Sequence, residues 1–158
     1  MTATAAETGG VQRLSVELAE RAYDILVGPG LIARAGALML PLMRRRQAVI
    51  VSDEIVARHH LAPLRHSLSE HGIATREIVL PPGEGTKDLG HFGRLVDDVL
   101  AAGIERGTML VALGGGVVGD IAGFAAATLL RGIDFVQIPT TLLAQVDSSV
   151  GGDRKSVV

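Results

Sequence analysis

The chain alternates between short runs of apolar residues and longer segments in which apolar residues recur at helical spacing. The runs around residues 48–51 and 109–113 are almost wholly apolar, which is typical of strands covered on both faces. The expected strands are Gln47–Val51, Arg76–Leu80, Thr108–Leu113 and Ile133–Ile138. The expected helices are 31–39, Glu54 to about His71, Lys87 or Asp88 to Ala102, and Val117–Leu130. Strands that alternate with helices predict an α/β fold with a Rossmann-like, doubly wound and mostly parallel sheet.

The N-terminal region follows a different pattern. Val11–Leu18 and Tyr23–Val27 alternate apolar and polar residues, which predicts an N-terminal β-hairpin. Residues 1–10 are rich in Ala and Thr and lack the basic and apolar regions of a secretory signal, so we expect a disordered arm. The expected organisation is this arm, one α/β domain at 11–152 and a short aberrant tail at 153–158.

Composition narrows the class of function. The 158 residues include 15 basic and 17 acidic side chains without a basic stripe, which argues against nucleic acid and anionic lipid as partners. No apolar run approaches the roughly 18 residues that span a bilayer, so we expect no membrane segment. The absence of cysteine excludes disulfides and thiolate metal sites, and it fits a cytoplasmic location. A small molecule is therefore the expected ligand.

The glycine-rich segment at 109–120 carries the strongest chemical signal. An apolar strand leads into Gly114, Gly115 and Gly116, which open a helix, and Asp120 follows within its first turns. Glycines let backbone N–H groups approach a pyrophosphate closely, and the helix N-terminus adds a positive dipole end. The segment is neither G-x-G-x-x-G nor a P-loop, because the P-loop lysine is missing. The alternative is a turn needed only to pack the helix tightly on the strand.

Two more segments follow strands and should lie at the same edge of the sheet. In the loop 81–87, Glu84 and Lys87 either face a ribose or are solvated charges of an ordinary turn. Asp53 follows the strand at 47–51, where a carboxylate either accepts ribose hydroxyls or caps the next helix.

The segment after the last expected strand combines hydroxyls with a carboxylate. Thr140 and Thr141 offer two hydroxyls to a ligand or serve as a helix cap, and Asp147 precedes two serines and a glycine pair. The five histidines show no convergent metal-ligand spacing, which favours surface histidines over a metal site.

Together, PPGEGTK and LGGGVVGDIAGFAAATLLRGIDFVQIPTTLLAQVDSSVGG closely resemble the 3-dehydroquinate synthase family. The resemblance covers nearly the whole chain after the N-terminal arm. It implies a shikimate-pathway enzyme that cyclises a seven-carbon keto-acid phosphate, 3-deoxy-arabino-heptulosonate 7-phosphate, with loss of phosphate. It also implies NAD and a zinc or cobalt ion as cofactors, held in a cleft between an α/β domain and a helical domain that follows.

The resemblance assigns roles position by position. Asp147 matches a carboxylate that contacts the substrate. Arg131 matches an arginine that reaches the phosphate of substrate in the neighbouring subunit, which implies a homodimer. The positions that match NAD-contacting motif residues are Asp53, Glu84, Lys87, Gly115, Gly116, Val117, Asp120, Thr140 and Thr141.

The chain departs from the family pattern after Gly152. The family continues with a lysine, a threonine and an asparagine that help to bind substrate and cofactor, whereas Asp153 follows here. The metal ligands of the family, a glutamate and two histidines, belong to the helical domain, which we expect to be absent. We therefore expect this chain to lack activity alone. The alternatives are another sugar-phosphate cyclase, a metal-dependent polyol dehydrogenase, or a non-catalytic fragment that binds nucleotide or dimerises.

Overall fold

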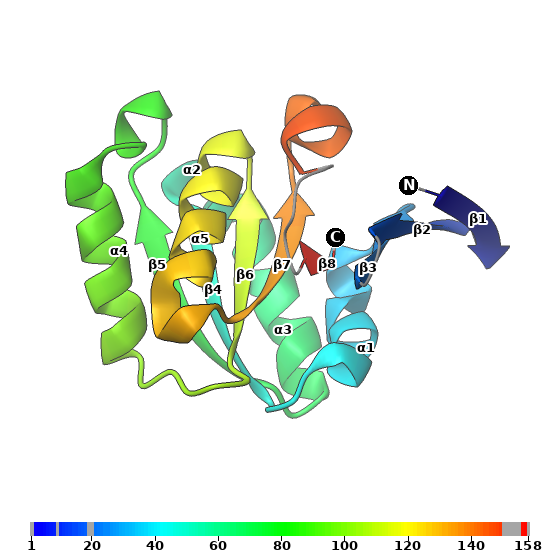
Figure 1. Ribbon diagram of the computed structural model, residues 1–158, viewed down its shortest axis with the longest axis horizontal. Helices are drawn as coiled ribbons and strands as arrows, with labels where there is room; N and C mark the ends of the chain where they lie inside the picture. Colours follow the sequence, from blue (N-terminus) through cyan, green and yellow to red (C-terminus); the bar gives the residue numbers. More distant parts are fainter. Residues whose placement is uncertain (1, 9, 19–20, 150–155, 158) are drawn as a thin grey trace.

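A parallel sheet forms the centre of the protein, as the computed structural model shows (Figure 1). The structure describes residues 2–8, 10–18, 21–149 and 156–157. The strands lie in the order β5-β4-β6-β7-β8 and all neighbours are parallel. They are β4 (Gln47–Asp53), β5 (Ala74–Leu80), β6 (Met109–Gly114), β7 (Asp134–Pro139) and β8 (Ser156–Val157). The expected α/β fold is confirmed, and its strand order changes direction between β4 and β6, where such sheets bind ligands.

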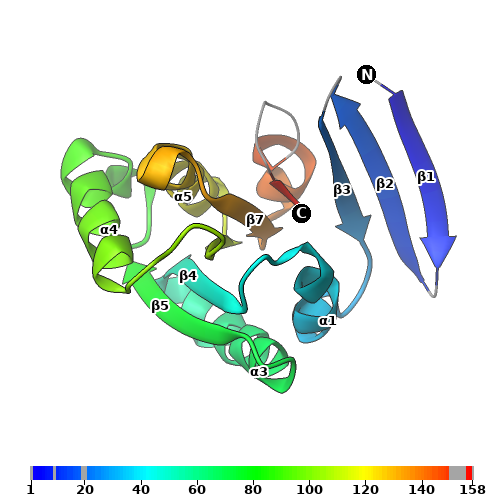
Figure 2. The ribbon, with the colours of Figure 1, turned by 60° about the horizontal axis from the view of Figure 1, so that its bottom comes forward.

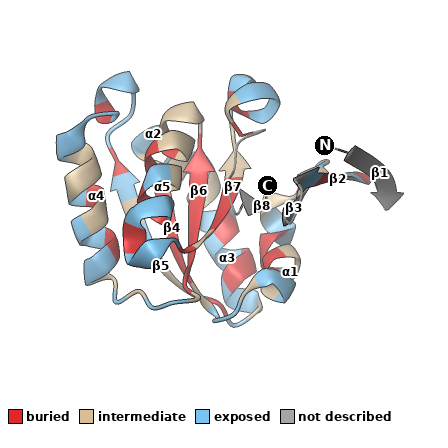
Figure 3. Cartoon of the chain, in the orientation of Figure 1, coloured by how far each residue is buried: buried red, intermediate tan, exposed pale blue. Residues whose placement is uncertain are grey.

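Helices cover both faces of this sheet (Figures 1 and 2). They are α1 (Ala35–Met39), α2 (Glu54–Val56), α3 (Ala62–Glu70), α4 (Leu89–Ala101) and α5 (Gly116–Thr128). Alternate residues of β6 face different helices: Val111 packs with α1 and α3, whereas Leu110 packs with α4 and α5. Both side chains are fully buried, and each contributes about 1.5–3 kcal/mol of hydrophobic stabilisation. Figure 3 shows the resulting core along the central strands and the inner helix faces.

The helix expected from Glu54 to His71 is interrupted. A π-helical turn at Ala57–Leu61 separates α2 from α3. Pro63 explains the break, because its ring clashes with the carbonyl of His59 and it has no N–H to donate to that carbonyl. A wider turn before the proline lets the chain continue in the same direction.

The N-terminal region forms a separate antiparallel sheet of three strands. The expected hairpin is present as β2 (Val11–Leu18) and β3 (Arg21–Val27). The expectation of a disordered arm at 1–10 is corrected, because Thr2–Thr8 forms β1 and pairs with β2 along its whole length. β-branched threonines suit a strand, and β1 satisfies backbone groups that would otherwise form an open edge of β2.

The expected end of the domain at residue 152 and the departure at Asp153 lie outside the described residues. Among the helices that the structure describes, none is long and apolar enough to cross a lipid bilayer.

Candidate functional site

The parallel register brings the candidate residues to one edge of the sheet. Asp53 lies opposite Leu80, and Gly114 lies opposite Pro139, so the neighbouring strands end level with one another. The loops that leave these strands lie together at the top of Figure 1. This edge, which we call the carboxyl edge, contains every sequence-predicted site residue except Arg131.

The glycine turn is confined by the segment that follows β7. A Cβ atom on Gly115 would lie 3.2 Å from Cγ2 of Thr141, and one on Gly116 would lie 3.1 Å from Oγ of Ser148. Both distances are shorter than an ordinary van der Waals contact, so a side chain at either glycine would push the glycine turn and the segment after β7 apart. The structure thus brings Gly115, Gly116 and Thr141 together.

The same turn opens α5 without a side-chain cap. α5 begins at Gly116, and the residue at its N-cap, Gly115, makes no side-chain capping hydrogen bond. The N–H groups of a first helical turn have no partner within the helix, so they can bind an anion. Gly114 is needed for packing, because a Cβ there would lie 2.7 Å from Cγ2 of Val118. Tight packing and anion binding are therefore both compatible with this turn.

Lys87 connects the loop 81–87 to α5. Its Nζ lies 3.0 Å from Oδ2 of Asp120 and 3.0 Å from Oε1 of Glu84. The hydrogen bond that Lys87 donates to Asp120, and then the one that it donates to Glu84, raises the pKa of Lys87, so this side chain is a cation at neutral pH. The loop is anchored by the buried Thr86, whose hydroxyl donates to the carbonyl of Pro81 at 2.7 Å. Lys87 is thus held in place and is more than a solvated charge of a turn.

Asp53 caps α2, which is one of the two roles that the sequence predicted for it. Its Oδ1 accepts hydrogen bonds from the N–H groups of Ile55 and Val56, both at 2.9 Å. Its Oδ2 has no hydrogen bond to any other residue in the described part of the chain, so contact with a ribose stays a prediction.

The two threonines after β7 differ in their surroundings. Oγ1 of Thr141 accepts from the N–H of Ala144 at 3.2 Å, which is the expected capping role. The N–H of Thr140 donates to the carbonyl of Gly114 at 3.0 Å, whereas its hydroxyl is buried and has no partner among the described residues. Thr140 therefore holds the end of β7 against the glycine turn and leaves one polar atom unused.

Asp147 and Arg131 lie far apart. Asp147 is exposed on a π-helical turn at Ala144–Ser148, near the carboxyl edge. Arg131 follows the other end of α5, which the 13 residues of that helix carry about 20 Å from the glycine turn. The helix expected to reach Leu130 stops at Thr128, because Leu130 and Arg131 both adopt left-handed conformations, with φ of 48° and 69°. Arg131 therefore does not face the site of its own chain.

Gln137 was missed by the sequence analysis. It lies in β7, is 4% exposed, and its Nε2 has no hydrogen-bond partner among the described residues. Its Oε1 would lie 3.6 Å from a Cβ atom on Gly119 in α5. The available signal was a polar residue within the apolar run of the last expected strand.

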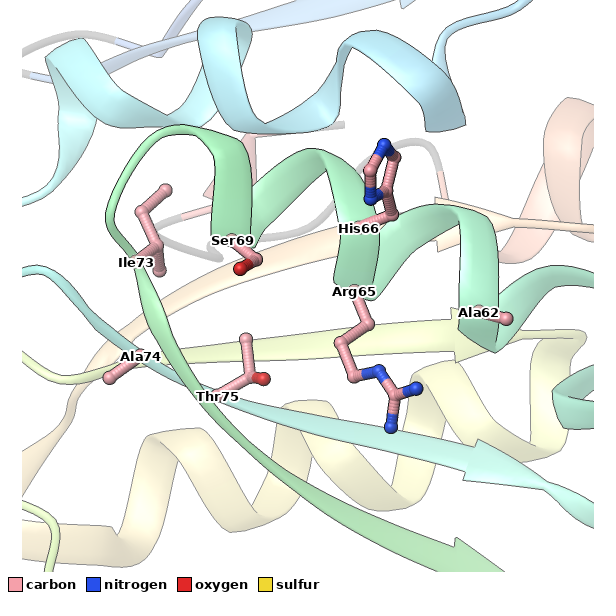
Figure 4. A pocket seen from close by; sticks show the side chains of 7 residues that line it. All are labelled: Ala62, Arg65, His66, Ser69, Ile73, Ala74 and Thr75. Atoms are coloured by element: carbon pink, nitrogen blue, oxygen red, sulfur yellow. The ribbon is translucent and has the colours of Figure 1, made fainter.

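Metal binding finds no support in this part of the protein. Among the described residues, no three histidine, aspartate or glutamate side chains lie close enough to hold an ion. A hollow of about 370 Å³ lies between α3 and the start of β5, away from the carboxyl edge (Figure 4). Figure 4 shows Arg65 and His66 pointing to different sides of α3, and Arg65 pairs with Glu77 at 3.4 Å. These side chains do not converge on one ligand.

Comparison with known proteins identifies the family. Residues 77–157 match the family model of the 3-dehydroquinate synthase N-terminal region. The 3-dehydroquinate synthase of Rhodospirillum rubrum is 60% identical over 139 residues, which cover 88% of this chain and 36% of that protein. The chain thus spans little more than a third of the length of this curated relative.

Solved structures agree with this result. A 2-deoxy-scyllo-inosose synthase complexed with carbaglucose-6-phosphate, NAD+ and Co2+ matches with a TM-score of 0.75 and 27% identity, over 86% of this chain and 36% of that one. A 2-epi-5-epi-valiolone synthase from Streptomyces hygroscopicus with NAD+ and Zn2+ bound matches with a TM-score of 0.73 and 30% identity, over 86% and 37%. Because the family model covers residues 77–157 and the sequence identity reaches 60%, the chain belongs to the 3-dehydroquinate synthase family and contains its N-terminal region.

Proposed function

We propose that this chain binds NAD at the carboxyl edge, as the cofactor-binding part of a 3-dehydroquinate synthase. The observation that carries the proposal is the uncapped N-terminus of α5 behind three glycines, next to the point where the strand order changes direction. The proposed cofactor-binding residues are Asp53, Glu84, Lys87, Gly115, Gly116, Val117, Asp120, Thr140 and Thr141.

The pyrophosphate of NAD would bind the backbone N–H groups of the glycine turn. The confined Gly115 and Gly116 let the phosphates come close, and a side chain at either position would fill that space. Asp120 places a negative charge in the first turns of α5, but the ion pair with Lys87 offsets its repulsion of an anion. Lys87 and Glu84 stand at the rim, where they would meet ribose hydroxyls. When bound, NAD supplies a hydride acceptor, and the protein supplies position and electrostatics.

For the complete protein we propose the family reaction, in which 3-deoxy-arabino-heptulosonate 7-phosphate is converted to 3-dehydroquinate with loss of phosphate. Asp147 would contact the substrate. The large apolar side chains of Leu142, Leu143 and Val146 are 76%, 70% and 67% exposed beside it, which supports a second wall of the cleft at this place. The described residues do not fit the zinc or cobalt ion of the relatives, so we propose that this chain alone has no synthase activity.

We further propose that the active form is a homodimer in which Arg131 serves the neighbouring subunit. Two consecutive left-handed residues other than glycine cost about 1–2 kcal/mol each, and such strain is retained mainly at functional positions. Arg131 is exposed at the end of α5 remote from the glycine turn, where it cannot reach a ligand of its own chain.

Titration calorimetry with NAD tests the proposal on the chain as it stands. We expect measurable binding that is weaker than that of a complete relative, because the chain tested spans little more than a third of the length of such a relative. Gly116→Val should abolish it, since even a Cβ there meets Ser148 at 3.1 Å. Gly93→Ala is the matched control, because a Cβ in that part of α4 meets nothing within 4 Å. No heat with NAD at millimolar protein and ligand would contradict the proposal.

Turnover assays separate the rival functions. The chain should not release phosphate, but a fusion to the helical domain of a relative, with the family sequence after Gly152, should do so when NAD and metal are added. Reduction of NAD by a simple polyol would favour a dehydrogenase instead. NAD binding or dimerisation without turnover in the fusion would favour a non-catalytic fragment. Cyclisation of a different sugar phosphate would favour another cyclase.

A further inference from the structure

Two buried polar atoms, one in β7 and one in the residue that follows it, have no partner among the described residues. They are Nε2 of Gln137 and Oγ1 of Thr140. Buried donors are nearly always hydrogen-bonded, because leaving one unpaired forfeits its bonds to water without replacement. Each of these two atoms therefore calls for an explanation.

The position of Gln137 relates both atoms to the N-terminus of α5. Residues of a strand alternate between faces, so Gln137 shares the face of Phe135, which packs in the cluster formed with α5. The carboxamide lies beside Gly119, one turn into the helix, and the absence of a side chain at Gly119 leaves room for it. Thr140 bonds the glycine turn itself through its N–H. The carboxamide of Gln137 and the backbone of Thr140 therefore both lie close to the start of α5.

We propose that Gln137 is a further binding residue of the diphosphate site, and that its Nε2 donates toward the anion together with the hydroxyl of Thr140. This inference rests on the proposed NAD site. A neutral amide suits the position, because a cation with 4% exposure would lose its hydration, whereas an amide loses much less. Within the part of the chain that the structure describes this donor has no partner, so the ligand would supply the missing bond.

Gln137→Met tests this role, because methionine has a similar length and no donor. A hydrogen bond to a charged group is stronger than one between neutral groups, so we expect the Kd for NAD and for ADP to rise about tenfold. Adenosine lacks the diphosphate, and its binding should not change. The urea midpoint should stay the same or rise, because the substitution removes an unpaired buried polar group.

Thr108→Val is the matched control. Thr108 is also fully buried, but its Oγ1 accepts from the N–H of Glu105 at 2.9 Å and donates to Oε1 of Gln47 at 2.8 Å. It lies immediately before β6, at the opposite edge of the sheet from the glycine turn. This variant should lower the urea midpoint and leave the Kd for ADP unchanged, which is the reverse of the result expected for Gln137→Met.

The possible outcomes distinguish a failure of the inference about Gln137 from a failure of the proposed NAD site. If the parent chain binds NAD and Gln137→Met binds ADP equally well, the amide only fills space and the inference is overturned. If the parent chain binds neither NAD nor ADP, the proposed site itself fails. Gln137→Asn retracts the donor by one methylene and should also weaken ADP binding, so the test remains decisive if methionine prevents folding.

Discussion

A methyl group at Gly114 should disturb folding and NAD binding together. In Gly114→Ala, the new Cβ would stand 2.7 Å from Cγ2 of Val118 and 2.8 Å from its Cβ, about 0.7 Å short of the 3.4 Å at which ordinary contact begins. Val118 is 2% exposed, and a valine in a helix has one strongly preferred rotamer, so it cannot turn aside. Overpacking of this kind costs about 1–3 kcal/mol, which urea denaturation of the variant should reveal.

The clash can be relieved only if the first turn of α5 moves away from β6. Because displacements near 1 Å of positioned groups cost up to about 100-fold, we expect Gly114→Ala to raise the Kd for NAD at least tenfold in calorimetry. Gly114→Ala combined with Val118→Gly removes the clashing methyls together with the Cβ at 2.8 Å, and should be less destabilised than the sum of the single variants. Gly93→Ala should gain about 0.5–1 kcal/mol and keep its Kd. Strict additivity in the double variant, or an unchanged Kd in Gly114→Ala, would refute this reasoning.

Three further substitutions test single residues. Asp53→Ala removes the helix cap and should lower stability by about 1 kcal/mol, whereas Asp53→Asn should keep the cap. Weaker NAD binding by the asparagine variant would therefore show that the charge of Asp53 contributes to binding. Asp120 and Glu84 raise the pKa of Lys87 above 10.5, so the charged lysine stabilises the fold fully below the pKa of the unfolded state and loses this effect as the pH rises through the pKa of the folded state. The difference in unfolding free energy between the parent chain and Lys87→Met should therefore be constant from about pH 7 to 10 and shrink above; a difference that persists unchanged at higher pH would contradict this prediction. Arg131→Gly should raise the free energy of unfolding by about 1 kcal/mol, because glycine adopts the left-handed conformation without strain, and it should leave NAD binding by the monomer unchanged. A lower urea midpoint would show that side-chain contacts of Arg131 outweigh the strain.

The sheet could be predicted from the sequence because its signals are local. β6 is a short apolar run that ends in glycines, and its pattern alone indicates a strand covered on both faces. β1 could not be predicted in the same way, because Thr2–Thr8 has no large apolar residue and its pairing depends on the edge of β2. The π-helical turn at Ala57–Leu61 was also missed, although Pro63 marks the place where a regular helix must yield.

The sequence indicated which loops form the candidate site, but it did not indicate the contacts between their side chains. Parallel strands all deliver their carboxyl ends to one edge, so any polar residue after a strand is expected there. The pairing of Lys87 with Asp120 depends on how far the loop 81–87 leans toward α5, which no local pattern reports. Gln137 escaped notice because only the packing of α5 on β7 decides that its amide is buried beside Gly119.

The burial of β6 on both faces also determines how the protein exchanges its amide protons with solvent. Its residues from Met109 to Leu113 are at most 3% exposed, so their amides should exchange only when the whole domain unfolds. The loop 81–87 is exposed except at Thr86, and the segment 141–147 is exposed except at Ala144, so both should exchange through local openings. A bound dinucleotide should slow exchange in these two segments and leave the protection pattern within β6 as it is. Deuterium labelling would thus distinguish the rigid strand β6 from the two exposed segments, whose order depends on the ligand.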